Sequence, residues 1–218
     1  MPTVLITGAN RGLGLEFARQ YSADGWDVVT TVREHSAELD ALNVRVEHLD
    51  MHDLHAVAHF GEKLESLDVL IANAGMYGPR SVISEHDGDG WLETFAVNTI
   101  APFLLAQSVL PLVSHTHGKL IAITSRMGSI EDNGSGGYIA YRSSKTALNS
   151  AWRSLAIDTQ RKAICAVLHP GWVQTRMGGD SAPLEPEQSV AGMRKVIEGL
   201  GPEQSGSFFG YDGSTIPW

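Results

Sequence analysis

TVLITGANRGLG, at residues 3–14, decides the fold of this chain. A short apolar strand ends at Thr7 and runs into a turn that contains Gly8, Gly12 and Gly14, after which a helical pattern begins. Small residues let the backbone turn tightly and approach a pyrophosphate, which would rest on the amino end of the helix. The glycine spacing differs from the common G-x-G-x-x-G fingerprint, and taken alone it would fit a structural tight turn nearly as well. Its place between a first strand and a first helix favours a dinucleotide site.

Short apolar runs alternate with longer helical patterns along the rest of the chain. The predicted strands are residues 3–7, 27–32, 44–49, 68–72, 119–124, 164–168 and 207–209. The predicted helices are residues 13–23, 37–42, 52–64, 91–113, 138–160 and 188–200. Strands that are apolar throughout are typical of a parallel sheet buried on both faces. The alternation predicts one α/β domain over residues 1–218, a doubly wound, mostly parallel sheet of the Rossmann type in a three-layer α/β/α sandwich.

The amino-acid composition argues against several classes of function. The 218 residues carry a net charge of −9, and no basic stripe of the kind that binds nucleic acid is visible. The single cysteine, Cys165, lies in an apolar run, and no signal peptide precedes the first strand, so we expect a cytoplasmic protein. Residues 94–118 lack Asp, Glu, Lys and Arg, but polar residues such as Asn98 favour a buried helix over a membrane span.

Three polar, glycine-rich stretches follow the fourth, fifth and sixth strands, at residues 77–90, 128–137 and 171–187. In a doubly wound sheet, ligands bind beyond the carboxyl ends of the strands. These loops are therefore expected to flank the site.

Tyr141 and Lys145 lie four residues apart at the start of a predicted helix, so they share one face. A free tyrosine is a poor acid–base catalyst at neutral pH, and a neighbouring cation would favour the phenolate and lower its pKa. A lone Y-x-x-x-K is more often an exposed helix face. Here Ser125 closes the fifth strand at the same edge, and Asn98 interrupts an apolar helix, either as a satisfied structural amide or as part of a catalytic relay.

The end of the second strand bears on the choice of cofactor. An acidic residue there would bind the ribose 2′-hydroxyl of NAD, but the chain has Val32 followed by Arg33, with Arg11 in the glycine turn. Each arginine alone could be a solvated surface residue. Two guanidinium groups together suit a 2′-phosphate and predict NADP(H).

Together these motifs resemble the short-chain dehydrogenase/reductase family, over essentially the whole chain, with the segments YIAYRSSKTALN and HPGWVQTRMGG most like C-factor-like and carbonyl-reductase-like members. The resemblance implies that Tyr141 protonates a carbonyl oxygen held by Ser125, that Lys145 binds the nicotinamide ribose, and that Asn98 helps hold a water. It also implies a cofactor site made of Gly8, Asn10, Arg11, Gly12, Leu13, Gly14, Arg33, Asp50, Met51, Asn73, Ala74, Gly75, Tyr141, Lys145, Pro170, Val173 and Thr175.

Two departures from the family pattern stand out. Ser125 precedes Tyr141 by 16 positions, about three more than is usual in the family, which implies an enlarged loop at residues 128–137 and leaves Ser129 as a weaker alternative for the serine. The loop after Pro170 is short, which favours a relatively open substrate site.

Several alternatives accompany this reading. His52, His55 and His59 recur at helical spacing, but such a row is more often a solvated face than a metal site, and no metal is predicted. The leading hypothesis is an NADP-dependent oxidoreductase that interconverts a small carbonyl compound and its alcohol. A dinucleotide-binding regulatory protein with little turnover is the alternative, and a nucleotide-sugar epimerase or dehydratase fits poorly. Family members often pair through their long helices, so we expect a homodimer or homotetramer.

Overall fold

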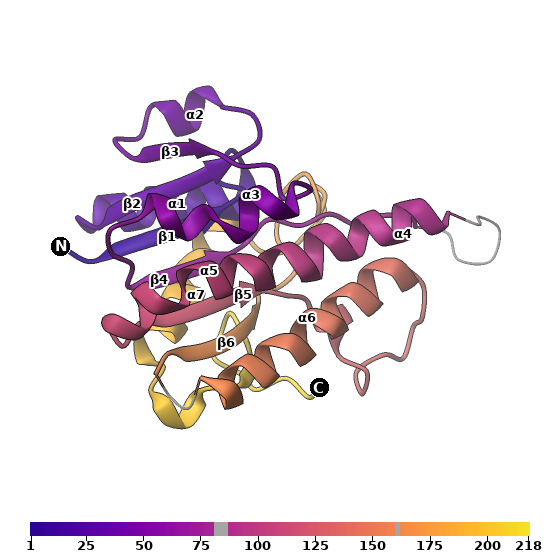
Figure 1. The fold of residues 1–218 in the computed structure, drawn as a ribbon. Helices are drawn as coiled ribbons and strands as arrows, with labels where there is room; N and C mark the ends of the chain where they lie inside the picture. Colours follow the sequence, from indigo (N-terminus) through magenta and orange to yellow (C-terminus); the bar gives the residue numbers. More distant parts are fainter. Residues whose placement is uncertain (81–86, 160–161) are drawn as a thin grey trace.

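Parallel strands form one sheet in the computed structural model, which describes residues 1–80, 87–159 and 162–218. Within these residues the strand order is β3-β2-β1-β4-β5-β6-β7, and every pairing of neighbours is parallel (Figure 1). The strands are β1 (Thr3–Thr7), β2 (Asp27–Val32), β3 (Arg45–His48), β4 (Val69–Ala72), β5 (Lys119–Ile123), β6 (Ile164–His169) and β7 (Ser207–Gly210). The predicted doubly wound, single-domain fold is confirmed.

Helices cover both faces of the sheet (Figure 1). On one face, α1 (Gly12–Ala23) and α7 (Pro186–Gly199) pack against one apolar cluster. On the other, α3 (Leu54–Ala58), α5 (Ala101–His115) and α6 (Ile139–Asp158) pack against a second. Two short helices, α2 (Ala37–Asp40) and α4 (Gly88–Phe95), complete the helical set, with short 3-10 turns at Phe60–Lys63, Arg126–Gly128 and Pro202–Gln204.

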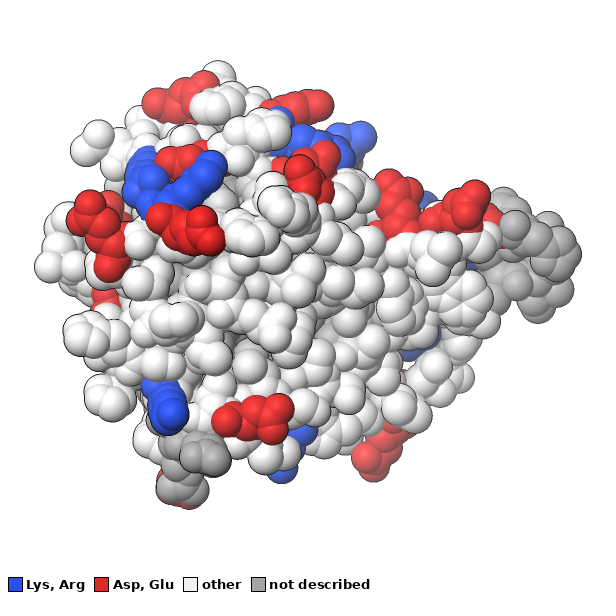
Figure 2. Space-filling model, viewed as in Figure 1, with Lys and Arg blue, Asp and Glu red and all other residues white. Residues whose placement is uncertain are grey.

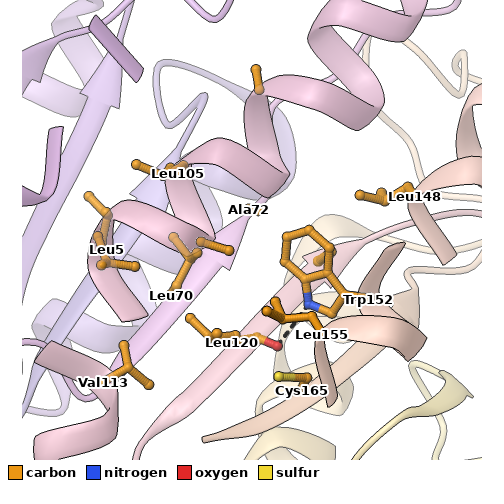
Figure 3. Packing of buried hydrophobic residues seen from close by; sticks show 14 of the residues in the cluster. Leu5, Leu70, Ala72, Leu105, Val113, Leu120, Leu148, Trp152, Leu155 and Cys165 are labelled. Carbon is orange, nitrogen blue, oxygen red and sulfur yellow. Dashed lines mark hydrogen bonds between the residues drawn. The ribbon is translucent and has the colours of Figure 1, made fainter. Parts of the chain in front are cut away.

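The packing of the sheet on α5 and α6 fixes the register that positions the site. Leu70 of β4 lies beside Leu5 of β1 and Leu120 of β5, and all three side chains are fully buried (Figure 3). The indole of Trp152 on α6 packs beside them and its Nε1 donates to the carbonyl of Leu120 at 3.0 Å. A buried indole N–H requires such a partner, so this bond ties α6 to the centre of the sheet.

Two predicted helices differ from the structure. The segment 52–64 is not one helix, because α3 ends after Ala58 and a 3-10 turn follows over Phe60–Lys63. The segment 91–113 belongs to a longer helical run that contains a widened π turn at Ala96–Ile100 between α4 and α5. Asn98 lies in this turn, and its side chain bonds Met76 and Ser144 outside the run. The centre of the predicted 77–90 loop, residues 81–86, and the end of the predicted 138–160 helix lie outside the described residues.

The helical run Gly88–His115 is long and apolar enough to cross a membrane. Its α5 part packs on the sheet, where Leu105, Val109 and Val113 are fully buried. Because one face of α5 covers the sheet, α5 is a core helix of the domain, as the polar residues in its sequence predict.

Candidate active site

The glycine turn, residues 7–14, is fixed by side chains from the neighbouring strand. Asn73, just after β4, donates from its Nδ2 to the carbonyls of Thr7 at 2.9 Å and Gly8 at 3.3 Å. In return, the Thr7 hydroxyl accepts from the backbone N–H groups of Asn73 and Ala74, both at 3.0 Å. These four bonds hold the ends of β1 and β4 together and set the course of the turn.

The turn leaves room for a ligand at the amino end of α1. A Cβ on Gly14 would lie against the carbonyl of Gly8 and 2.7 Å from Asn73 Nδ2, so a side chain cannot be accommodated there. Arg11 is the N-cap in an extended conformation, with no side-chain capping bond, and the first turn of α1 has no acidic residue. Asn10 and the half-buried Leu13 complete the turn. Unpaired helix N–H groups with an exposed arginine beside them suit a pyrophosphate.

Arg33 and Asp50 lie at the carboxyl ends of β2 and β3. Arg33 is exposed directly after β2. Asp50 accepts from the backbone N–H of His52 at 3.0 Å and bonds its ring Nδ1 at 2.8 Å, and these bonds, with the positive charge of Arg33, lower the pKa of the Asp50 carboxyl. Met51 is nearly buried in the core. The structure thus brings Arg33 and Asp50 into one electrostatic neighbourhood, as a ribose and adenine site would require.

The segment after β6, which contains Pro170, Val173 and Thr175, approaches the glycine turn. The Pro170 carbonyl accepts from the Ser189 hydroxyl at 2.6 Å, and Val173 is buried and bridges to Leu184. The Thr175 methyl lies 3.4 Å from the place a Cβ would take on Gly12. Of the predicted residues of this loop, Thr175 therefore meets the glycine turn, while Pro170 and Val173 are held by Ser189 and Leu184.

Tyr141 and Ser125 meet at the carboxyl end of β5. Tyr141 is 6 % exposed, and its phenol lies close enough to the Ser125 hydroxyl for the serine to act on its pKa. Burial, the neighbouring Tyr77 and Ser125 act on its pKa in that order, and burial dominates, so the pKa of Tyr141 is raised. This differs from the predicted lowering by Lys145, because the desolvation of a buried phenolate outweighs other influences in the protein alone.

Lys145 lies one helical turn beyond Tyr141 on the same buried face of α6. Its Nζ donates to the Ile123 carbonyl at 2.9 Å and lies 6.0 Å from the centre of the Tyr141 ring. Burial lowers the pKa of Lys145 to about 8, so the ammonium form still prevails at neutral pH. A cation is thus held near the phenol.

Asn98 links the π turn to the segment after β4. Its Oδ1 accepts from the Met76 N–H at 2.9 Å, and its Nδ2 donates to the Met76 carbonyl at 2.8 Å and to Ser144 Oγ at 3.0 Å. A Cβ on Gly75 would lie 3.2 Å from Asn98 Oδ1 and 3.5 Å from Lys145 Nζ. The bare glycine keeps open a space lined by the Asn98 amide oxygen and the Lys145 ammonium. That space suits a small polar group.

Ser125 rather than Ser129 is the serine that the structure brings to Tyr141. Ser125 begins the serine turn, residues 125–128, and its hydroxyl accepts from the Met127 N–H at 3.1 Å. Ser129 donates to the Trp218 carbonyl at 3.2 Å and accepts from the Asp132 N–H at 3.1 Å, both within the structural framework of the enlarged loop.

Tyr77 is a site residue that the sequence interpretation missed. Its ring centre lies 4.8 Å from that of Tyr141 and 5.6 Å from that of Tyr138, and the Arg80 guanidinium lies 5.5 Å from it. Its ring therefore packs against that of Tyr141. Its position two residues after Gly75 is a usable signal, because that segment follows a strand on the ligand side.

The row of histidines on and around α3 is engaged in other contacts. His52 bonds Asp50 at 2.8 Å and pairs with Glu93 of α4 at 2.9 Å, and the rings of His55 and His59 stack with centres 4.4 Å apart. Within the described parts of the chain, no three metal-ligating side chains come together.

Comparison with known proteins identifies the family. The sequence profile of the short chain dehydrogenases matches residues 2–185. The chain belongs to the short chain dehydrogenase family. Among curated relatives of this family, the C-signal of Myxococcus xanthus is 45% identical over 154 residues, which cover 70% of this chain and 93% of that protein.

Two solved short chain dehydrogenase structures match over the whole chain. The carbonyl reductase Sniffer of D. melanogaster has a TM-score of 0.92 at 34% identity, with 100% of both chains covered. An NADPH-bound carbonyl reductase from chicken fatty liver has a TM-score of 0.90 at 31% identity, with 100% of this chain and 99% of that chain covered. The protein is thus an oxidoreductase of this family with a nicotinamide dinucleotide as cofactor, and the glycine turn fits that group.

Proposed function

We propose that this protein is an NADP(H)-dependent reductase of small aldehydes or ketones, or the reverse alcohol dehydrogenase. The observation that carries the proposal is the buried approach of Tyr141 to Ser125, with Lys145 anchored on the same helix face and the glycine turn at the same sheet edge. The carbonyl reductases among the structural neighbours support the same reaction class.

When bound, the nicotinamide would supply hydride to the carbonyl carbon. The Ser125 hydroxyl donates a hydrogen bond to the carbonyl oxygen and orients it toward Tyr141. Burial keeps the Tyr141 phenol protonated at neutral pH, so the acid form is present when the substrate arrives. The oxygen that gains negative charge is a stronger base than a phenolate, and Tyr141 can therefore protonate it in spite of the raised pKa.

Lys145 then stabilises the phenolate that remains on Tyr141. Its ammonium group is already anchored on the Ile123 carbonyl and requires no large movement. A preorganised charge in a site sheltered from water acts more strongly than one in solution. Asn98 and Gly75 border the space beside this ammonium, which supports the proposed path from Lys145 to solvent through a water.

For the cofactor, we propose NADP(H) over NAD(H). Arg11 and Arg33 are both exposed at the carboxyl edge, one at the glycine turn and one after β2, where Val32 stands in place of an acid. Guanidinium groups bind a phosphate in a bidentate manner, which an NAD ribose cannot exploit.

A panel of aldehydes, ketones and quinones, with NADPH oxidation followed by absorbance, tests the reaction. We expect turnover by the wild type and a loss of at least about a thousandfold in kcat for Tyr141→Phe, because the proton donor is removed. Tyr21→Phe is the matched control, since Tyr21 is also buried but lies by Arg194 between α1 and α7. If wild type and Tyr141→Phe bind NADPH and share the same negligible rate, the enzyme assignment is wrong. The result would then favour a dinucleotide-binding regulatory protein with little turnover.

We further propose a cytoplasmic homodimer or homotetramer that associates through the long helices. The face of the molecule that carries α4, α5 and α6 has a wide area without charged side chains (Figure 2). Exposed apolar residues on these helical segments include Leu92, Ile100 and Ile157, at 72%, 44% and 64% exposure. An uncharged helical face of this kind is typical of a homo-oligomeric contact. Light scattering of the purified protein would give its mass, and a monomer at micromolar concentration would contradict the proposal.

A further inference from the structure

Asn149 continues the row of buried polar residues on α6. It follows Lys145 by four positions, as Lys145 follows Tyr141, so the three share one helix face. Asn149 is 2% exposed and lies too deep to meet a substrate. A buried amide is costly unless its donor and acceptor are both used, so its partners show what it holds.

Both partners of Asn149 adjoin Ser125. The Thr124 hydroxyl, one residue before the serine, donates to Asn149 Oδ1 at 2.7 Å. Asn149 Nδ2 donates to the carbonyl of Gly128, which ends the serine turn, at 3.3 Å. A carboxamide can accept on one side and donate on the other, which neither aspartate nor an apolar side chain can do.

The serine turn is therefore clamped at both ends. The Gly128 N–H donates to the Ser125 carbonyl at 2.8 Å, and the Thr146 hydroxyl adds a second bond to the Gly128 carbonyl at 2.9 Å. Because the Ser125 hydroxyl caps this same turn, a rotation of the turn would carry the hydroxyl away from Tyr141. Arg142 Nη1 also donates to the Met127 carbonyl within the turn at 3.4 Å, and just beyond it the N–H groups of Ile130 and Glu131 donate to the Trp218 carbonyl at 3.0 Å.

We propose that Asn149 is a positioning residue, which fixes the Ser125 hydroxyl against Tyr141 by bonding Thr124, directly before the serine turn, and Gly128, at its end. The inference rests on the proposed function, since it assumes that Ser125 orients the carbonyl. It assigns to Asn149 no contact with substrate or cofactor.

A double-mutant cycle tests this role, with kcat measured for Asn149→Ala, Ser125→Ala and the double variant. We expect Asn149→Ala to lower kcat about tenfold, because a small displacement of a positioned group is costly. Ser125→Ala should lower kcat about a hundredfold. In the Ser125→Ala background, Asn149→Ala should add less than about a twofold loss, because both changes remove the same interaction. Equal losses in both backgrounds, or no loss in either, would overturn the proposal.

Two further measurements keep the result independent of stability. The NADPH Kd of Asn149→Ala should match the wild type, and Thr159→Val, another buried polar residue near the end of α6, should leave kcat unchanged. If Asn149→Ala does not fold, Thr124→Val removes one of the two bonds with little change of shape, and the same cycle is run with it.

Hydrogen–deuterium exchange separates this inference from the proposed function. Peptides covering residues 124–137 should exchange faster in Asn149→Ala than in the wild type, while peptides from β1 and the glycine turn should not change. Unaltered exchange in 124–137 would refute the clamp. If the wild type shows no NADPH-dependent turnover, the proposed function fails, and the exchange result alone decides whether Asn149 holds the serine turn.

Discussion

The glycine turn at residues 7–14 and the serine turn at residues 125–128 each follow a strand of the same sheet, yet residues from different parts of the chain hold them in place. The conformation of the glycine turn depends on its glycines and on the hydrogen bonds donated by Asn73, which follows the adjacent strand. The serine turn depends on α6 side chains, Asn149 and Thr146, that reach back across the enlarged loop. The first is encoded by a local pattern, whereas the second depends on contacts that no short motif contains.

The strongest test of this contrast is a side chain in the glycine turn. Gly14→Ala should lower the free energy of unfolding by about 3 kcal/mol, because its Cβ would collide with the Gly8 carbonyl and with Asn73. NADPH binding should be lost together with stability. Urea unfolding and cofactor titration measure both, and Gly199→Ala, which meets no atom within 4 Å, is the matched control. Wild-type stability and affinity for Gly14→Ala would show that the turn is less constrained than its geometry indicates.

A second test concerns the cofactor side alone. Arg33→Ala should weaken NADPH binding about thirtyfold and NADH binding about twofold or less, since only NADPH presents a 2′-phosphate for charge-assisted hydrogen bonds. Fluorescence titration gives both constants. Arg45→Ala, an exposed arginine of β3 paired with Glu47, should change neither. Equal losses for the two cofactors would remove the basis for NADP(H).

A third test concerns the catalytic side alone. Tyr77→Ala should lower kcat about tenfold with an unchanged NADPH Kd, because the ring that packs 4.8 Å from Tyr141 is removed and water reaches the phenol. Tyr77→Phe keeps the ring and should stay within about twofold of the wild type. A parallel loss in both variants would assign the effect to the hydroxyl of Tyr77 instead of its ring.

The smallest expected effect concerns acid stability near the catalytic side. Burial, then the charge of Arg126, lowers the pKa of His169 to about 4, and Asp212 opposes this change. The unfolded chain takes up a proton as pH falls through about 6.5, while folded His169 does not, so the free energy of unfolding decreases between pH 6.5 and pH 4.

Replacement of His169 by asparagine should remove this contribution. Between pH 6.5 and pH 5.5 we expect the wild type to lose about 1 kcal/mol more than His169→Asn, as measured by urea unfolding. Parallel curves for the two proteins would mean that His169 takes up a proton over this range as readily in the folded protein as in the unfolded chain.

The contrast between the turns also shows what the sequence could predict. The alternation of strands and helices, the glycine turn and the Tyr141–Lys145 pair follow from apolar runs and short spacings, which depend on local chemistry, whereas the strand order came from the structure. The break in the predicted 52–64 helix does not, because apolar periodicity continues through α3 and the 3-10 turn alike. Tyr77 and Asn149 lie close to the predicted motifs in the sequence, but only the fold shows that Tyr77 packs on Tyr141 and that Asn149 bonds Thr124 beside Ser125.

The π turn at Ala96–Ile100 has a geometric consequence for the long helical run. One extra residue in a helix changes the angular phase of everything beyond it by about 100°. Before the turn, Thr94 of α4 lies against Gly78 beside the site, and after it Leu105 of α5 faces the sheet. The deletion of a single residue from this turn would bring the two segments back into phase, and α4 could no longer face the site while α5 covers the sheet.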